Sequence, residues 1–174
     1  MIRSIARPAI LVAAIACAHS RDSATEPASD NPSLSVTDES LRQAIGARSS
    51  WTFYRNNSNR LSRSAGSGHV EPQLRTQYNP RAATMLDANG RVRAGSSFPD
   101  SSIIVKELYA GGAITTLAVM MKLRGSPQAS QGDWVWGYYD GAGGVRISVT
   151  TRGSGCAGCH ASGIDYTRMN DSHP

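Results

Sequence analysis

Four apolar runs of strand length, separated by short turns, dominate the second half of the chain. They cover residues 103–109, 115–123, 134–139 and 145–151. The first is rich in β-branched residues, and in the last one apolar and polar residues alternate, as in a sheet with one solvated face. Successive strands joined by short turns favour an antiparallel meander. The expected fold class is therefore mainly β (α+β), an antiparallel β meander with accessory helices.

The first half of the chain contains weaker signals. A helix is expected to begin near Ser35 or Thr37, where acidic residues follow and favour the positive end of the helix dipole. Residues 55–80 are polar and rich in Gly, Ser and Asn, which predicts a long loop with at most a short helix. Turns are expected at residues 87–90 and 98–101.

The sequence Cys156-Ala-Gly-Cys159-His160 has the C-x-x-C-H spacing that marks covalent attachment of a c-type haem. Two thiols three positions apart on one helical turn can reach the two vinyl groups of the porphyrin as thioethers. The next residue, His160, is then directed at the iron as its proximal ligand. The predicted cofactor is therefore one covalent haem c, bound at the C-terminal end of the β domain.

Two other interpretations of this motif are weaker. A zinc site would need a second pair of ligands at similar spacing, whereas His19, His69 and His173 are isolated. A thioredoxin-like redox pair would begin a helix after a parallel strand, whereas this pair follows an antiparallel meander.

The sequence leaves the sixth coordination position of the iron open. The candidates for a sixth ligand are Met85, Met120, Met121, Met169, His69 and His173. The alternative is an open distal site. An open site favours binding of small molecules, whereas a sixth ligand favours simple electron transfer.

The N-terminal segments have the arrangement of an exported protein. Residues 1–16 form an expected signal peptide, with a basic start, a short apolar stretch and small residues before Cys17. Cys17 is placed like the acylated cysteine of bacterial lipoproteins; cleavage elsewhere, with Cys17 lost or left as a free thiol, is the alternative. Residues 17–36 predict a flexible tether, residues 37–166 the haem domain, and residues 167–174 a polar tail. The expected location is the periplasm, where a lipid on Cys17 would attach the protein to a membrane.

Basic residues are numerous but are not gathered into one surface. The chain has 18 of them and a net charge of +5, without a clustered basic face or interleaved aromatic residues, so nucleic acid is not an expected partner. The basic residues include two lysines, Lys106 and Lys122, both inside or at the end of apolar runs. Their stems can cover apolar surface while the ammonium groups reach water, or one lysine can point at the haem.

Several segments resemble the cytochrome P-460 family, which also includes the cytochromes c′-beta. The resemblance rests on residues 98–109 (FPDSSIIVKELY), 120–122 (MMK) and 132–139 (GDWVWGYY), together with the C-terminal C-x-x-C-H motif. It covers roughly residues 50–166. The resemblance implies a mostly antiparallel β domain with accessory helices and a five-coordinate haem c, and a homodimer is a further expectation.

Within this family, the P-460 enzymes carry a lysine linked covalently to the porphyrin edge and oxidise hydroxylamine. The c′-beta members lack this link and bind nitric oxide or carbon monoxide at an apolar distal face. By this resemblance Lys106, in the matching Val-Lys-Glu context, is the first candidate for the link and Lys122 the second. The distal carboxylate of the hydroxylamine oxidisers has no counterpart in residues 148–155.

The sequence therefore predicts an exported mono-haem cytochrome of P-460 type with an open distal site. We expect it to bind or oxidise small nitrogen species, such as nitric oxide or hydroxylamine, and to exchange electrons with a redox partner protein. The alternative is a six-coordinate electron-transfer cytochrome c without catalytic activity.

Overall fold

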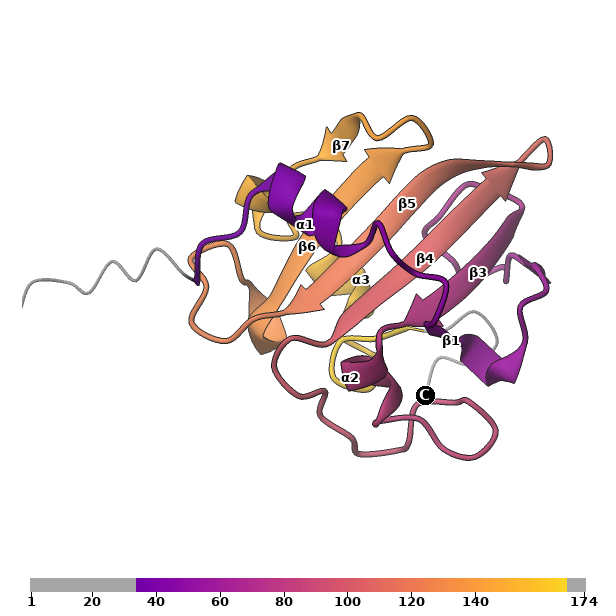
Figure 1. Cartoon of the computed structure of the whole chain (residues 1–174), viewed down its shortest axis with the longest axis horizontal. Helices are drawn as coiled ribbons and strands as arrows, with labels where there is room; N and C mark the ends of the chain where they lie inside the picture. Colours follow the sequence, from indigo (N-terminus) through magenta and orange to yellow (C-terminus); the bar gives the residue numbers. More distant parts are fainter. Residues whose placement is uncertain (1–33, 169–174) are drawn as a thin grey trace, which may run out of the picture. The chain divides into compact units, whose positions relative to one another are not determined.

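A computed structural model describes residues 34–168, which contain one seven-stranded sheet (Figure 1). The elements, in chain order, are α1 (Asp38–Ala44), β1 (Thr52–Phe53), η2 (Tyr54–Asn56), β2 (Leu61–Ser62), β3 (Gln73–Tyr78), α2 (Pro80–Ala83), β4 (Ile103–Ala110), β5 (Ala113–Lys122), η3 (Gln131–Asp133), β6 (Trp134–Asp140), β7 (Val145–Ile147), η4 (Val149–Thr151) and α3 (Ala157–His160). The expected signal peptide, Cys17 and most of the tether lie outside the described residues, as do His19, Met169 and His173. No helix within residues 34–168 is long and apolar enough to cross a membrane.

The strands confirm the antiparallel meander. Their order across the sheet is β1-β3-β4-β5-β6-β7, β2 also pairs with β3, and every pairing is antiparallel. Strands β4, β5 and β6 correspond closely to the first three apolar runs of the sequence. The chain is therefore mainly antiparallel β structure with few helices.

Helix α1 covers one face of the sheet (Figure 1). It begins where expected, because Thr37 caps its first turn and forms reciprocal hydrogen bonds with Ser40. Leu41 and Ile45, one helical turn apart, are buried against apolar side chains of the central strands. This packing makes the first of two hydrophobic cores.

The second core lies on the opposite face of the sheet, where α3 is found (Figure 1). The strand register places Ile104, Met120 and Trp136 side by side in one row across β4, β5 and β6. Because successive side chains of a strand point to opposite faces, the next row on this face contains Lys106, Ala118 and Tyr138. This face carries the candidate site.

Strand β3 was not expected, because it lies within the segment predicted as a long loop. In its sequence, QLRTQY, two of the four buried residues are polar. Leu74 and Tyr78 are buried on the face of the second core. On the other face Gln77 donates a hydrogen bond to the buried Glu107 (2.9 Å). Polar pairing thus replaces the apolar pattern by which a buried strand is usually recognised.

The last apolar run, residues 145–151, was wrongly predicted as one strand. Strand β7 ends at Ile147, and the side chain of Ser148 accepts a hydrogen bond from the Thr150 amide, which caps η4. Val145, which alternation placed on the covered face, is 52% exposed. The serine cap ends the strand, and a register shift between Tyr138 and Tyr139 of β6 breaks the alternation, because Ile147 and Val145 pair with these two neighbours.

Packed structure extends slightly beyond residues 37–166 at both ends. Val36, in the segment predicted as a tether, is buried in the first core, and its amide donates to the Gln128 side chain (3.0 Å). Thr167, in the segment predicted as a tail, is buried as well.

Candidate haem site

A cavity with about 880 Å³ of free space, part of it open to solvent, lies on the second face of the sheet. Its apolar lining includes Leu74, Ile104, Met120 and Trp136. The two thiols and the histidine of the C-x-x-C-H motif line the same cavity. The structure therefore brings all three residues of the predicted attachment site to one space.

Glycine backbone geometry leads the chain into the motif. Gly153 has a left-handed φ of 69°, and a Cβ atom there would lie 2.3 Å from the ring of Trp136. Only glycine lets the backbone pass this close to the ring in that conformation. Cys156 then caps the single turn of α3, and its carbonyl accepts the His160 amide (3.1 Å). Cys156 is half-buried and Cys159 exposed, and both are free thiols.

The ring of His160 is held in one orientation by two contacts. Its Nδ1 lies 3.0 Å from the carbonyl oxygen of Tyr166, and its ring meets Trp136 edge-on at 4.9 Å. A carbonyl oxygen can only accept, so Nδ1 carries the proton and Nε2 keeps its lone pair. Burial and the nearby charge of Lys106 lower the pKa of His160 to about 4. The ring is thus neutral and has the arrangement typical of a metal-ligating histidine.

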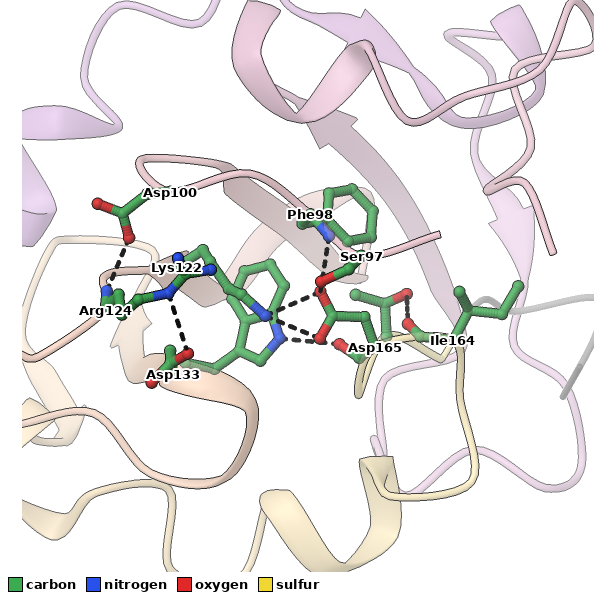
Figure 2. Close-up of polar contacts among 10 residues, drawn as sticks. Ser97, Phe98, Asp100, Lys122, Arg124, Asp133, Ile164 and Asp165 are labelled. Carbon is green, nitrogen blue, oxygen red and sulfur yellow. Dashed lines mark hydrogen bonds and ion pairs between the residues drawn. The ribbon is translucent and has the colours of Figure 1, made fainter. Parts of the chain in front are cut away.

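The loop that supplies the Tyr166 carbonyl is anchored by Asp165 (Figure 2). Lys122 donates to both carboxylate oxygens of Asp165, at 2.8 and 2.9 Å, and the Phe98 amide donates to the same carboxylate at 2.7 Å. The indole of Trp134 donates to the Asp165 carbonyl (2.8 Å). Asp165 and Tyr166 both have positive φ values, 46° and 62°. These contacts of Asp165 fix the turn, and with it the position of the Tyr166 carbonyl oxygen that accepts the hydrogen bond from His160.

The two lysines are therefore in different surroundings. Lys106 lines the cavity, and its Nζ donates to the carbonyl of Arg168 (3.2 Å). Burial, together with the charge of Arg168, lowers the pKa of Lys106 to about 8. Lys122 is not among the residues that line the cavity and is 3% exposed within its ion pair with Asp165. Of the two candidates for a haem link, the structure places Lys106 beside the motif.

The candidates for a sixth ligand separate in the same way. His69 and Met120 line the cavity, whereas Met85 and Met121 do not. Met120 belongs to the second core, packed in the row of Ile104. Of these two lining residues, His69 is the one whose side chain carries ring nitrogen atoms that donate or accept hydrogen bonds.

His69 is itself held by Tyr138. The Tyr138 hydroxyl and His69 Nδ1 share a hydrogen bond, and the rings stack with centroids 5.9 Å apart at an interplanar angle of 21°. Burial lowers the pKa of His69 to about 3 and raises that of Tyr138. Both groups are therefore neutral near pH 7.

The thiols and the histidine of the motif do not converge as ligands of a bare metal ion would. No group of three or more His, Cys, Asp or Glu side chains that could hold a metal ion occurs in the part of the chain that the structure describes. Thiols at the wall of a large apolar cavity, beside an oriented neutral histidine, fit thioether attachment of a porphyrin better.

Two parts of this site were not foreseen from the sequence. Tyr138 could have been found, because alternation along residues 134–139 places it on the face of Trp136. Asp165 could not, because no local pattern links it to Lys122, 43 residues earlier. Long-range ion pairs of this kind appear only once the loop is seen against the sheet.

No protein-family model matches this chain, and no curated protein matches it. The resemblance to the cytochrome P-460 family therefore stays a prediction from the sequence.

Proposed function

We propose that this chain is an exported mono-haem c-type cytochrome with an open distal site for small nitrogen species. The observation that carries the proposal is the shared cavity: Cys156, Cys159 and His160 line one large apolar space, and His160 presents an unprotonated Nε2. Cys156 and Cys159 would attach the haem, and His160 would be its proximal ligand. When bound, the haem iron supplies ligand binding and electron transfer.

The residues of the chain would shape this chemistry in three ways. The carbonyl of Tyr166 holds the imidazole of His160 in the tautomer that can ligate iron. Apolar side chains such as Ile104 and Trp136 form part of the cavity lining and would limit the water in contact with a bound ligand. Lys106 and Arg168 bring positive charge to the cavity wall and would pair with anionic groups of a bound haem.

Oxidation of hydroxylamine is the more specific form of this proposal, and it depends on a lysine link to the porphyrin. Lys106 supports it, because the amine lines the cavity and its pKa of about 8 leaves a usable neutral fraction at mildly alkaline pH. Export, attachment to the membrane through Cys17, a redox partner protein and a homodimer belong to the same proposal and are carried by the sequence alone.

A second candidate function is electron transfer by a six-coordinate iron. The observation that favours it is His69, a second imidazole at the same cavity. Reduced protein in carbon monoxide separates the two functions. An open site gives a high-spin ferrous spectrum that changes on adding the gas, whereas a low-spin spectrum that does not change supports electron transfer.

Covalent attachment is tested by expressing the chain with a c-type haem maturation system. We expect haem stain to remain with the polypeptide on a denaturing gel, to weaken in Cys156→Ser or Cys159→Ser, and to disappear in the double variant. Cys17→Ser is the matched control, because it removes the cysteine outside the motif and should leave the stain unchanged. An unstained parent protein, or an equally stained double variant, would refute the proposal.

A further inference from the structure

Two imidazoles line the haem cavity, and each is held against a different row of the same sheet face. The ring of His160 contacts Trp136, and the ring of His69 stacks on Tyr138. Trp136 and Tyr138 are two residues apart in β6, so their Cα atoms are roughly 6.8 Å apart along the strand. His69 is therefore held near His160, but over the row of side chains that contains Tyr138 and not beside the Trp136 ring.

The hydrogen bond to Tyr138 determines what the other nitrogen of His69 can do. Within residues 34–168, Nδ1 of His69 is the one hydrogen-bond partner of the Tyr138 hydroxyl. If Nδ1 carried the proton, Nδ1 would donate to the Tyr138 oxygen. The proton of the half-buried Tyr138 hydroxyl would then have no acceptor among these protein atoms. Donation by Tyr138 to Nδ1 satisfies the pair. Nε2 of His69 then carries the proton, which makes it a donor and blocks the lone pair that iron would need.

We propose that His69 is a distal hydrogen-bond donor, oriented by Tyr138, that selects ligands whose outer atom accepts a hydrogen bond. This inference rests on the proposed function, because it concerns the distal side of the same haem site. It assigns the ligand class as small nitrogen or oxygen species with a polar outer atom, such as nitric oxide or nitrite, in preference to carbon monoxide. It also explains why a cavity with an imidazole in its wall can keep the iron open.

The test uses the haem-loaded protein and the C–O stretching frequency of its ferrous carbon monoxide complex. A distal N–H donor withdraws charge toward the oxygen and lowers this frequency, so we expect it to rise in His69→Leu. His69→Gln keeps an amide N–H and should recover part of the shift. Tyr138→Phe should give an intermediate value, because Nδ1 loses its donor and the proton can move there. Tyr139→Phe is the matched control: its hydroxyl contacts Asp38 on the other face, and the frequency should not change.

Affinity gives a second measurement. We expect His69→Leu to weaken nitric oxide binding by about twofold to tenfold, the worth of one net hydrogen bond, and to change carbon monoxide binding less. Equal frequencies and affinities in the parent and His69→Leu would overturn the inference while leaving the haem proposal intact. So would a parent that binds carbon monoxide only after His69 is replaced, because His69 would then be the sixth ligand. A parent without covalent haem would overturn the proposed function itself.

Discussion

Lys106 and Lys122 project from the same face of the sheet, yet their surroundings differ completely. Lys122, at the end of β5, is enclosed with Asp165 in a buried ion pair that other donors complete (Figure 2). Lys106, in the middle of β4, faces the cavity, and no carboxylate within residues 34–168 pairs with it. Lys122 thus stabilises the loop beside the cavity through its ion pair, whereas the amine of Lys106 can contact a molecule bound in the cavity.

The difference follows from what each charge costs. When a buried ammonium group pairs with a carboxylate that accepts further hydrogen bonds, these contacts offset the free energy of removing both charges from water. Removing one partner leaves the other charge buried and unpaired, which destabilises the fold. A buried ammonium group with a carbonyl acceptor alone is poorly compensated, and its pKa falls. Substitutions at the two positions should therefore have opposite effects on stability.

The largest effect is expected at the paired lysine. Lys122→Met leaves the carboxylate of Asp165 buried without its cation, and we expect the free energy of unfolding to fall by about 3–5 kcal/mol. Because Asp165 precedes the Tyr166 carbonyl that holds His160, the haem-loaded variant should also show a changed iron–histidine vibration. Denaturant unfolding and resonance Raman spectroscopy measure the two effects. A loss below about 1 kcal/mol would show that the pair is not the anchor.

A smaller effect of opposite sign is expected at Lys106. Its pKa is lowered to about 8 from an ordinary value of 10.5. Between those pH values the unfolded chain binds more protons than the folded chain, so the stability of the parent rises with pH. Lys106→Met removes this titration. We expect the variant, prepared without haem, to be more stable than the parent by about 2–3 kcal/mol at pH 7, with the advantage shrinking from pH 8 to pH 10.5.

Unfolding midpoints of the parent and Lys106→Met across that pH range measure the predicted convergence. A constant difference between the two proteins, or a variant that is less stable at pH 7, would show that the ammonium group of Lys106 is well compensated.

The smallest effect is expected at an exposed ion pair beside the buried one. Arg124 and Asp133 are 3.7 Å apart, with 72% and 43% of their side chains exposed (Figure 2). Water screens such a pair, and Arg124→Met should change the free energy of unfolding by about 0.5 kcal/mol or less. The same denaturant series checks it. A loss comparable to that of Lys122→Met would mean that burial does not decide the difference between the two pairs.

The sequence predicted the parts of the molecule that local patterns encode. The apolar runs gave β4, β5 and β6, and the spacing of Cys156, Cys159 and His160 placed them on one helical turn. Strand β3 was missed, because polar residues fill half of its buried positions. The two lysines looked alike in the sequence, since each lies in an apolar run, and only the three-dimensional contacts show which one meets Asp165.

Mass spectrometry of the protein after maturation with c-type haem tests covalent haem attachment most directly. We predict an intact mass increased by one haem, and, after digestion, haem on the peptide that contains Cys156 and Cys159. If a lysine link also forms, the attached peptide should contain Lys106 and not Lys122. An intact mass without haem would contradict the central claim, and haem attached through Lys122 would contradict the assignment of the two lysines.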